Sequence, residues 1–207
     1  MADTAGLTAW VQEFARAVHE HRDELTELDS AIGDADHGSN MDRGMTAAVA
    51  ALDATPPADP AALLKTVAMT MISKVGGTSG PLYGTLFLRM SGAIGDGSPA
   101  AFAAAFRAGV EGVVARGKAE LGDKTMLDAL LPAADALDAA VAAGRPLDAA
   151  LEAAAAAARE GRDATVPLQA RKGRASYLGE RSVGHQDPGA TSTVLLLEAA
   201  ATTLSGS

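Results

Sequence analysis

The chain has 207 residues, with 17 basic and 26 acidic side chains, a formal net charge of −9 and no cysteine. The negative charge argues against nucleic acid and anionic membranes as partners, and the lack of cysteine excludes disulfides and thiolate metal sites. The length suits one domain, predicted to span residues 1–207. Because no apolar run reaches the ~18 residues of a membrane span and the N-terminus lacks the order of a signal peptide, we expect a cytoplasmic protein.

Helical periodicity dominates the pattern of apolar residues. From Leu7 to Ile32 these residues follow the spacing of one helix face, with charged residues between them. Asp59 followed by Pro60 predicts a helix start, because a proline at the first helical position loses no hydrogen bond. The expected helices cover residues 7–32, 40–52, 59–74, 80–94, 98–117, 125–143, 146–161 and 189–204, with a long loop at 162–188.

No segment predicts a β-sheet. The β-branched residues are scattered rather than alternating with polar ones, and only 3% of residues are aromatic. Alanine-rich stretches such as residues 149–158 favour helix, because alanine has the highest intrinsic helix propensity. The predicted fold class is therefore all-α, a single domain of about eight helices.

Three carboxylates lie close together in the sequence between residues 28 and 41. Asp29, Asp34 and Asp36 stand where a predicted helix gives way to a glycine-flanked loop. Gathered carboxylates repel one another unless a cation or protons neutralise them, and their hard oxygen atoms suit Mg²⁺ or Ca²⁺. An EF-hand is excluded, because Gly38 and Met45 occupy two of its ligand positions. The alternative is a solvated turn in which Asp34 and Asp36 cap a helix.

A second unusual segment is the glycine-rich stretch at residues 74–85. Glycines let backbone N–H groups turn toward a ligand, and a helix beginning at Pro81 would direct its positive end at an anion. Thr78 and Ser79 add hydroxyl donors. The spacing matches neither a Walker loop nor a dinucleotide fingerprint. The segment is either a phosphate-binding loop or an ordinary turn between helices.

A third segment, residues 171–181, is basic. It carries four basic side chains against one acidic side chain, in a chain whose net charge is −9. Because arginine binds phosphate with two parallel hydrogen bonds, this segment could cover a nucleotide as a mobile flap. A solvated surface loop would have the same composition. The unusual length of the 162–188 loop favours a functional role.

Four segments occur in order between residues 33 and 190. They read GDADHGSNM from residue 33, GGTSGPLYG from residue 76, GDKTMLD from residue 122 and GRASYLG from residue 173, and DPGA follows from residue 187. In sequence and order, these segments closely resemble the nucleotide-binding L subunits of bacterial dihydroxyacetone kinases.

The resemblance implies a barrel of eight antiparallel helices with the nucleotide site at one end. It implies that Asp29, Asp34 and Asp36 hold two Mg²⁺ ions that bridge the phosphates of ADP, and that Arg174 is the catalytic cation. The residues that match the nucleotide contacts of these subunits are His37, Gly38, Ser39, Asn40, Thr78, Ser79, Gly117, Met126, Arg174, Asp187, Pro188 and Gly189.

The resemblance also implies partners. A separate K subunit would hold dihydroxyacetone, and a phosphohistidine carrier, the M subunit of a phosphoenolpyruvate phosphotransferase system, would phosphorylate the bound ADP to ATP. A homodimer is a further candidate assembly. Two alternatives stay open: an ATP-dependent kinase subunit for dihydroxyacetone or another short ketose, and a nucleotide-binding regulatory module that binds a transcription factor.

Overall fold

A computed structural model describes residues 2–204, and these residues form nine α-helices and one 3-10 helix without a β-strand. The all-α prediction is confirmed. The elements, in chain order, are α1 (Thr4–Glu20), α2 (Arg22–Ile32), α3 (His37–Ala54), α4 (Pro60–Lys74), α5 (Ser79–Ser91), α6 (Pro99–Gly117), α7 (Leu127–Ala142), α8 (Leu147–Ala164), η1 (Arg174–Ser182) and α9 (Pro188–Thr203).

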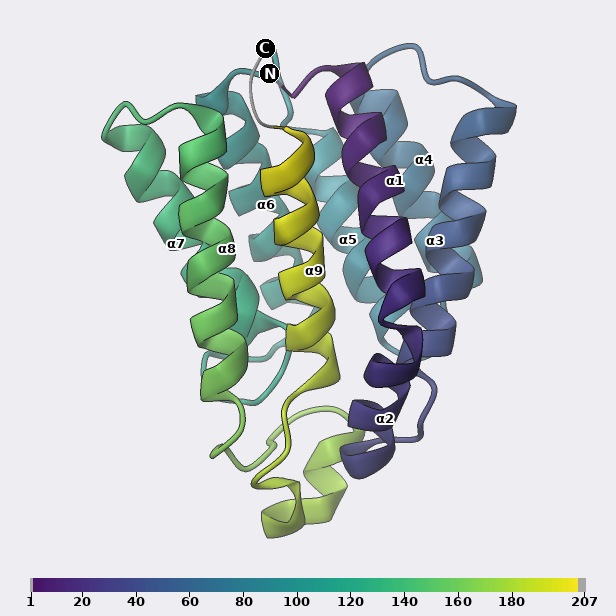
Figure 1. Cartoon of the computed structure of the whole chain (residues 1–207), viewed down its shortest axis with the longest axis vertical. Coiled ribbons are helices and arrows are strands. Elements are labelled where there is room, and N and C mark those ends of the chain that lie inside the picture. The colour runs from purple at the N-terminus through teal and green to yellow at the C-terminus, as the bar shows by residue number, and fades with distance from the viewer. Residues whose placement is uncertain (1, 205–207) are drawn as a thin grey trace.

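Eight of these helices, α1 and α3–α9, form a closed ring, which Figure 1 shows from the side. Around it α1 contacts α3, each helix from α3 to α8 contacts the next, and α9 packs against both α8 and α1. Neighbouring helices run in opposite directions, because the chain turns back at the end of each one. This arrangement is the predicted antiparallel barrel, and α2 and η1 extend it at one end (Figure 1).

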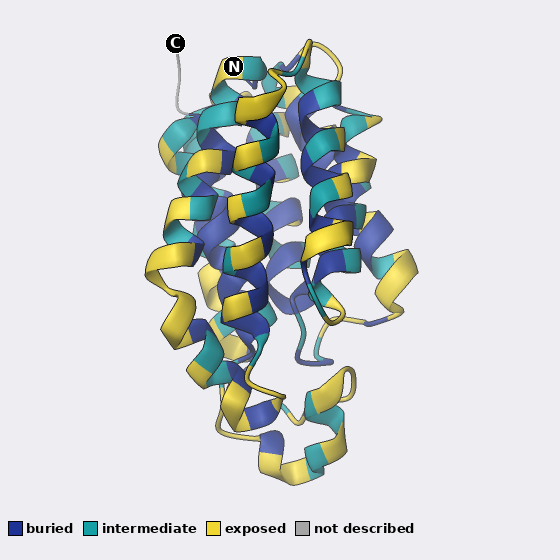
Figure 2. Cartoon of the chain, turned by 90° about the vertical axis from the view of Figure 1, so that its right-hand side faces the viewer, coloured by how far each residue is buried: buried dark blue, intermediate teal, exposed yellow. Residues whose placement is uncertain are grey.

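The core fills the inside of the ring. Buried residues lie on the inward sides of the helices and exposed residues on the outward sides (Figure 2). The Trp10 ring lies 5.7 Å from the ring of Phe87 and 5.8 Å from that of Phe102, centroid to centroid. Its indole Nε1 donates a hydrogen bond of 2.9 Å to the Leu196 carbonyl, so the buried N–H group is satisfied. No helix among residues 2–204 is long and apolar enough to cross a membrane.

Side-chain caps set several helix starts. Asp59 Oδ1 accepts the N–H of Ala62 at 2.7 Å, and Pro60 is the first residue of α4, which confirms that predicted start. Ser98 caps α6 in the same way through the N–H of Ala101, at 3.2 Å. Such a cap stabilises a helix by about 1 kcal/mol, because it satisfies an N–H group without a partner in the helix.

The continuous helix predicted over residues 7–32 is wrong at one point. The chain leaves helical geometry at His21, where φ is −97° and ψ is 11°, so that α1 and α2 are separate. The apolar pattern does not reveal this break, because Val18 and Leu25 lie two helical turns apart on either side of it. The predicted loop at 162–188 also contains η1, and α3 begins at His37, earlier than residue 40. A single domain over residues 1–207 stays a prediction, and residues 1 and 205–207 lie outside the described part of the chain.

The alternation of the ring places four helix N-termini together. The first residues of α3, α5, α7 and α9 lie at the end that α2 and η1 extend, opposite the chain termini (Figure 1). Helix N-termini carry unpaired N–H groups and partial positive charge, so they attract anions. This end of the ring is therefore suited to phosphate groups.

Candidate metal and nucleotide site

The three aspartates of the acidic loop converge in space. One carboxylate oxygen from each of Asp29, Asp34 and Asp36 lies within 4.8 Å of the others. Asp29 is buried in the last turns of α2, Asp36 is half-buried and Asp34 is exposed. The three carboxylates thus extend from the buried Asp29 to the solvent-exposed Asp34.

Local backbone geometry fixes the buried member of this group. Asp29 Oδ2 accepts the N–H groups of Asp36 at 2.8 Å and of His37 at 3.1 Å. A Cβ atom at Gly33 would lie 2.0 Å from Asp29 Oδ1, so the loop can pass the carboxylate only with glycine there. Ala35 adopts a left-handed φ of 60°. The turn is therefore built around Asp29, whereas Asp34 and Asp36 face outward. Asp36 stands at the N-cap of α3, but its side chain makes no capping hydrogen bond there, unlike in the solvated-turn alternative.

The donor set suits Mg²⁺. All three groups offer hard carboxylate oxygens, and Mg²⁺ is commonly held by one or two carboxylates together with phosphate oxygens and water. The nearby cation is Arg174, whose Nε lies 3.0 Å from Asp34 Oδ2. Arg174 therefore meets the acidic group from the η1 side, as expected for a basic segment that covers the site.

His37 joins three helices at this end. Its Nδ1 lies 3.1 Å from Ser79 Oγ at the start of α5, and its Nε2 lies 2.9 Å from Ser192 Oγ in α9. Ser192 in turn contacts the Tyr83 hydroxyl at 2.8 Å. Burial lowers the pKa of His37, with Asp29 opposing this shift. The imidazole thus fixes the relative positions of α3, α5 and α9 beneath the site.

Asn40 presents an unpaired buried donor beside the glycine loop. Its Oδ1 accepts a hydrogen bond of 2.6 Å from Arg43, whereas its buried Nδ2 has no partner among the described residues. A Cβ atom at Gly76 would lie 3.0 Å from both terminal atoms of the amide. The glycine loop therefore passes directly over this amide.

Asp187 closes the opposite side of the site. Its Oδ2 accepts the N–H of Ala190 at 2.7 Å and so caps α9. Burial, together with the charges of Asp128 and Asp29, raises the pKa of Asp187 to about 7. Gly189 follows in the first turn of α9, and a Cβ atom there would lie 3.5 Å from Met126. The segments around residues 126 and 187–189 are thus adjacent.

The remaining predicted contacts also lie at this end, in different environments. Ser39 and Thr78 are exposed, and Pro188 is buried at the start of α9. Gly117 is the last residue of α6, and a Cβ atom there would lie 3.5 Å from the Leu82 side chain. Gly38 is buried against α2, where a Cβ would lie 2.0 Å from the Arg22 carbonyl. Close packing between α2 and α3 is therefore one reason for glycine at this position.

Sequence reasoning missed three buried charged residues in the GDKTMLD segment, namely Asp123, Lys124 and Asp128. Asp128 is 4% exposed, and its carboxylate accepts the N–H groups of Gly122 and of Thr125, the latter at 2.7 Å. Lys124 is 1% exposed. Three charged residues within seven positions were the available signal, but burial cannot be seen in a sequence.

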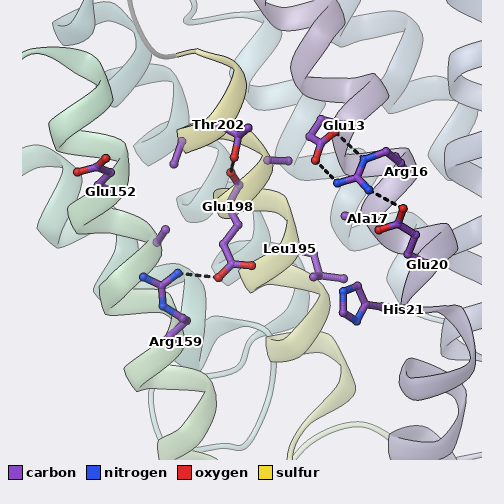
Figure 3. A pocket seen from close by; sticks show the side chains of 13 residues that line it. Glu13, Arg16, Ala17, Glu20, His21, Glu152, Arg159, Leu195, Glu198 and Thr202 are labelled. Carbon is purple, nitrogen blue, oxygen red and sulfur yellow. Dashed lines mark hydrogen bonds and ion pairs between the residues drawn. The ribbon is translucent and has the colours of Figure 1, made fainter.

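A hollow of about 600 Å³ lies elsewhere, on the side of the ring between α1, α8 and α9 (Figure 3). Its arginines are already paired. Arg16 binds Glu13 and Glu20, and Arg159 binds Glu198 (Figure 3). The carboxylate triad and the four helix N-termini lie at the end of the ring instead, so we place the candidate site there.

Comparison with known proteins agrees with this geometry. The DAK2 domain family matches residues 31–202, and the chain belongs to this family, among the DhaL-type subunits. It is 44% identical to the ADP-binding subunit DhaL of the PEP-dependent dihydroxyacetone kinase of Escherichia coli over 93% of each chain. It is 45% identical to the subunit of the same name of kinase 1 of Listeria innocua, over 92% of this chain and 91% of the other.

A solved structure shares the fold. The crystal structure of the dihydroxyacetone kinase of C. freundii in complex with AMP-PNP and Mg²⁺ matches with a TM-score of 0.73 and 25% identity. The match covers 94% of this chain and 33% of that enzyme, so the chain corresponds to about a third of its length.

Proposed function

We propose that the chain is the ADP-binding subunit of a phosphoenolpyruvate-dependent dihydroxyacetone kinase. The observation that carries this proposal is the convergence of three carboxylates and four helix N-termini at one end of the ring. Relatives that are 44–45% identical over nearly their whole length bear that name. Phosphoryl transfer mainly requires positioning and neutralisation of charge, which such an end can supply.

In this proposal Asp29, Asp34 and Asp36 hold two Mg²⁺ ions. When bound, these ions neutralise the phosphate oxygens of the nucleotide and hold them in place. The protein's own contribution is a fixed Asp29 carboxylate, oriented by two backbone N–H groups, and two outer carboxylates that can adjust. The structurally similar C. freundii enzyme was solved in complex with AMP-PNP and Mg²⁺, which supports a nucleotide with Mg²⁺ as the ligand.

The nucleotide would lie across the helix N-termini. The first turn of α3, residues 37–40, and the start of α5, with Thr78 and Ser79, face one side of it. Met126 and residues 187–189 face the other, with Gly117 at the edge. The unpaired Asn40 Nδ2 supports this placement, because a buried donor without a partner costs about 1–3 kcal/mol unless a ligand satisfies it.

Arg174 would act on the transferred phosphoryl group. Its side chain is 66% exposed and contacts Asp34, so it can turn toward a phosphate without breaking a buried contact. A guanidinium group placed where charge is redistributed stabilises the transition state more than the bound ground state.

The substrate and donor lie on other chains in this proposal. A K subunit would bind dihydroxyacetone, and a phosphohistidine carrier, the M subunit, would supply the phosphoryl group that reaches the ketone through the bound nucleotide. A cytoplasmic location and a homodimer stay predictions from the sequence.

The test measures turnover with limiting nucleotide. Mixed with the K subunit and the carrier system, the chain should phosphorylate dihydroxyacetone from phosphoenolpyruvate many times per molecule of ADP. The copurifying nucleotide, identified by mass, should be ADP or ATP. Sustained turnover on ATP with the K subunit alone, with release of free ADP, would instead indicate an ATP-dependent kinase subunit.

A further inference from the structure

Lys124 has an unusual backbone and an unusual environment. It lies in the turn before α7 with φ of 63°, in the left-handed region that costs a residue with a side chain roughly 1–2 kcal/mol. Its side chain is 1% exposed. A glycine would adopt this backbone without strain, so the reason for lysine must lie in the side chain.

The Lys124 ammonium group is surrounded by backbone carbonyl oxygens. Four carbonyl oxygens share the three N–H groups of Nζ, those of Thr165 at 2.9 Å, Leu168 at 3.1 Å, Ser182 at 2.7 Å and His185 at 2.5 Å. Burial lowers the pKa of Lys124, while Asp187 and Asp128 oppose this shift and the four acceptors favour the charged form. Several carbonyl oxygens around one small cation are also the ligand set that proteins use for monovalent ions.

These four acceptors come from both ends of one segment. Two precede residues 169–181 and two follow them, so a single cation joins the chain where it leaves the barrel and where it returns. Three hydrogen bonds complete the base of this loop: Ala170 N to Ser182 Oγ at 2.9 Å, Gly184 N to the Val166 carbonyl at 2.8 Å, and Arg171 N to the Asp123 carbonyl at 3.1 Å. We call residues 165–170 and 182–187 the loop base.

Beyond the loop base, η1 packs against α2 but buries little, since Ser182 is the residue of η1 that is buried. Residues 171–174 and Tyr177 are exposed, and the ion pair of Arg174 with Asp34 is itself in solvent. Such an exposed ion pair contributes only about 0–1 kcal/mol. The position of Arg174 is therefore set by the loop base together with the packing of η1 against α2. The same base holds the start of α9, because the Asp187 N–H donates to Thr165 Oγ1 at 3.0 Å.

We propose that Lys124 is a positioning residue for phosphoryl transfer, acting as a built-in cation that closes the base of the loop that carries Arg174. This inference rests on the proposed function. Lys124 touches neither nucleotide nor substrate. Its effect follows from geometry, since a shift of about 1 Å in a reacting group can reduce a rate by roughly a hundredfold.

The first measurement uses the wild-type chain. In hydrogen exchange, the amides of Arg171, Gly184 and Asp187 should exchange slowly, as core amides do, whereas those within residues 174–181 exchange fast. Fast exchange at all of these positions would overturn the proposal, because the loop base would then not be fixed.

The second measurement compares substitutions at two lysines that both have left-handed backbone, Lys124 and Lys118. Lys124→Met should speed exchange at the loop base and lower kcat by about ten- to a hundredfold, with a smaller change in the Kd for Mg-ADP. Lys118→Met is the control for stability and exchange, because Lys118 has φ of 50° but is exposed; it should leave the loop base protected. A Lys124→Met variant that matches the wild type in exchange and kcat would overturn the positioning role.

The third measurement tests the cation itself. In Lys124→Ala, ammonium or potassium ions should restore part of the lost turnover at constant ionic strength, whereas lithium or tetramethylammonium should not. Equal turnover in all four salts would overturn the assignment to the ammonium group. Failure of the wild-type chain to bind Mg-ADP would overturn the proposed function instead, so the two failures are distinguishable.

Discussion

Replacing Asp34 by asparagine should separate metal binding from stability. Asp34 is exposed, and its carboxylate lies within 4.8 Å of those of Asp29 and Asp36. For such exposed groups in water, the repulsion between the carboxylates and the attraction of the ion pair with Arg174 at 3.0 Å each amount to about 1 kcal/mol, and they act in opposite directions. The two effects nearly cancel. We therefore expect the free protein to melt within roughly 1 °C of the wild type.

The ligand-bound protein should behave differently. At about 100 times its Kd, Mg-ADP stabilises the wild type by about 2.7 kcal/mol, which corresponds to a rise in Tm of roughly 5–10 °C for a chain of this size. Asp34→Asn should abolish this rise, because the variant lacks a metal ligand. Thermal melts with and without Mg²⁺ and ADP measure both quantities, with Asp53→Asn at the far end of α3 as an exposed control.

Two outcomes would contradict this reasoning. If Asp34→Asn keeps the full Mg-ADP shift, Asp34 is not a metal ligand. If the free variant melts many degrees lower, the carboxylate supports the turn itself, as the solvated-turn alternative requires. Asp29 is unsuitable for this test, because its carboxylate also accepts two backbone N–H groups and its loss would destabilise the loop.

Three further predictions address other parts of the molecule. Arg174→Ala should lower kcat more than it weakens ADP binding, and equal kcat and Kd values in variant and wild type would make the basic segment a plain surface loop. Asp187→Asn should remove a pH dependence. Because the folded-state pKa of Asp187 is about 7, well above the unfolded value, this carboxyl stabilises the wild type most at acidic pH, and its contribution of up to roughly 4 kcal/mol is lost as pH rises from about 4 through 7. Asparagine can still accept the Ala190 N–H. In melts without ligand, the stability of the variant relative to the wild type should therefore rise between pH 4 and pH 8. If the stabilities of the two proteins change with pH in parallel, Asp187 does not have the raised pKa. Gly161→Ala should destabilise the fold by about 1–3 kcal/mol in denaturant titrations, because the new Cβ would lie 2.0 Å from the Asp128 carbonyl between α7 and α8; an unchanged midpoint would show that these helices can separate.

The sequence by itself determined the fold class and the residue types of the candidate site. Helical spacing, helix caps such as Asp59 and the glycine breaks are local features, so they can be recognised without knowing which segments meet. The acidic, glycine-rich and basic segments carry their residue types openly, and their order between residues 33 and 190 was enough to indicate the family. The break at His21 was not foreseen, because it leaves the apolar spacing intact.

Only the tertiary structure decided how these segments combine. Closure of the ring brings the N-termini of α3, α5, α7 and α9 to one end. It thereby places His37 in contact with Ser79 and Ser192, which lie 42 and 155 residues away in the chain. The burial of Lys124 and Asp187 is likewise invisible in the sequence, since it depends on what packs over them. A charged side chain has the same letter in solvent and in the core, but its pKa, its partners and its role are set by the groups that surround it.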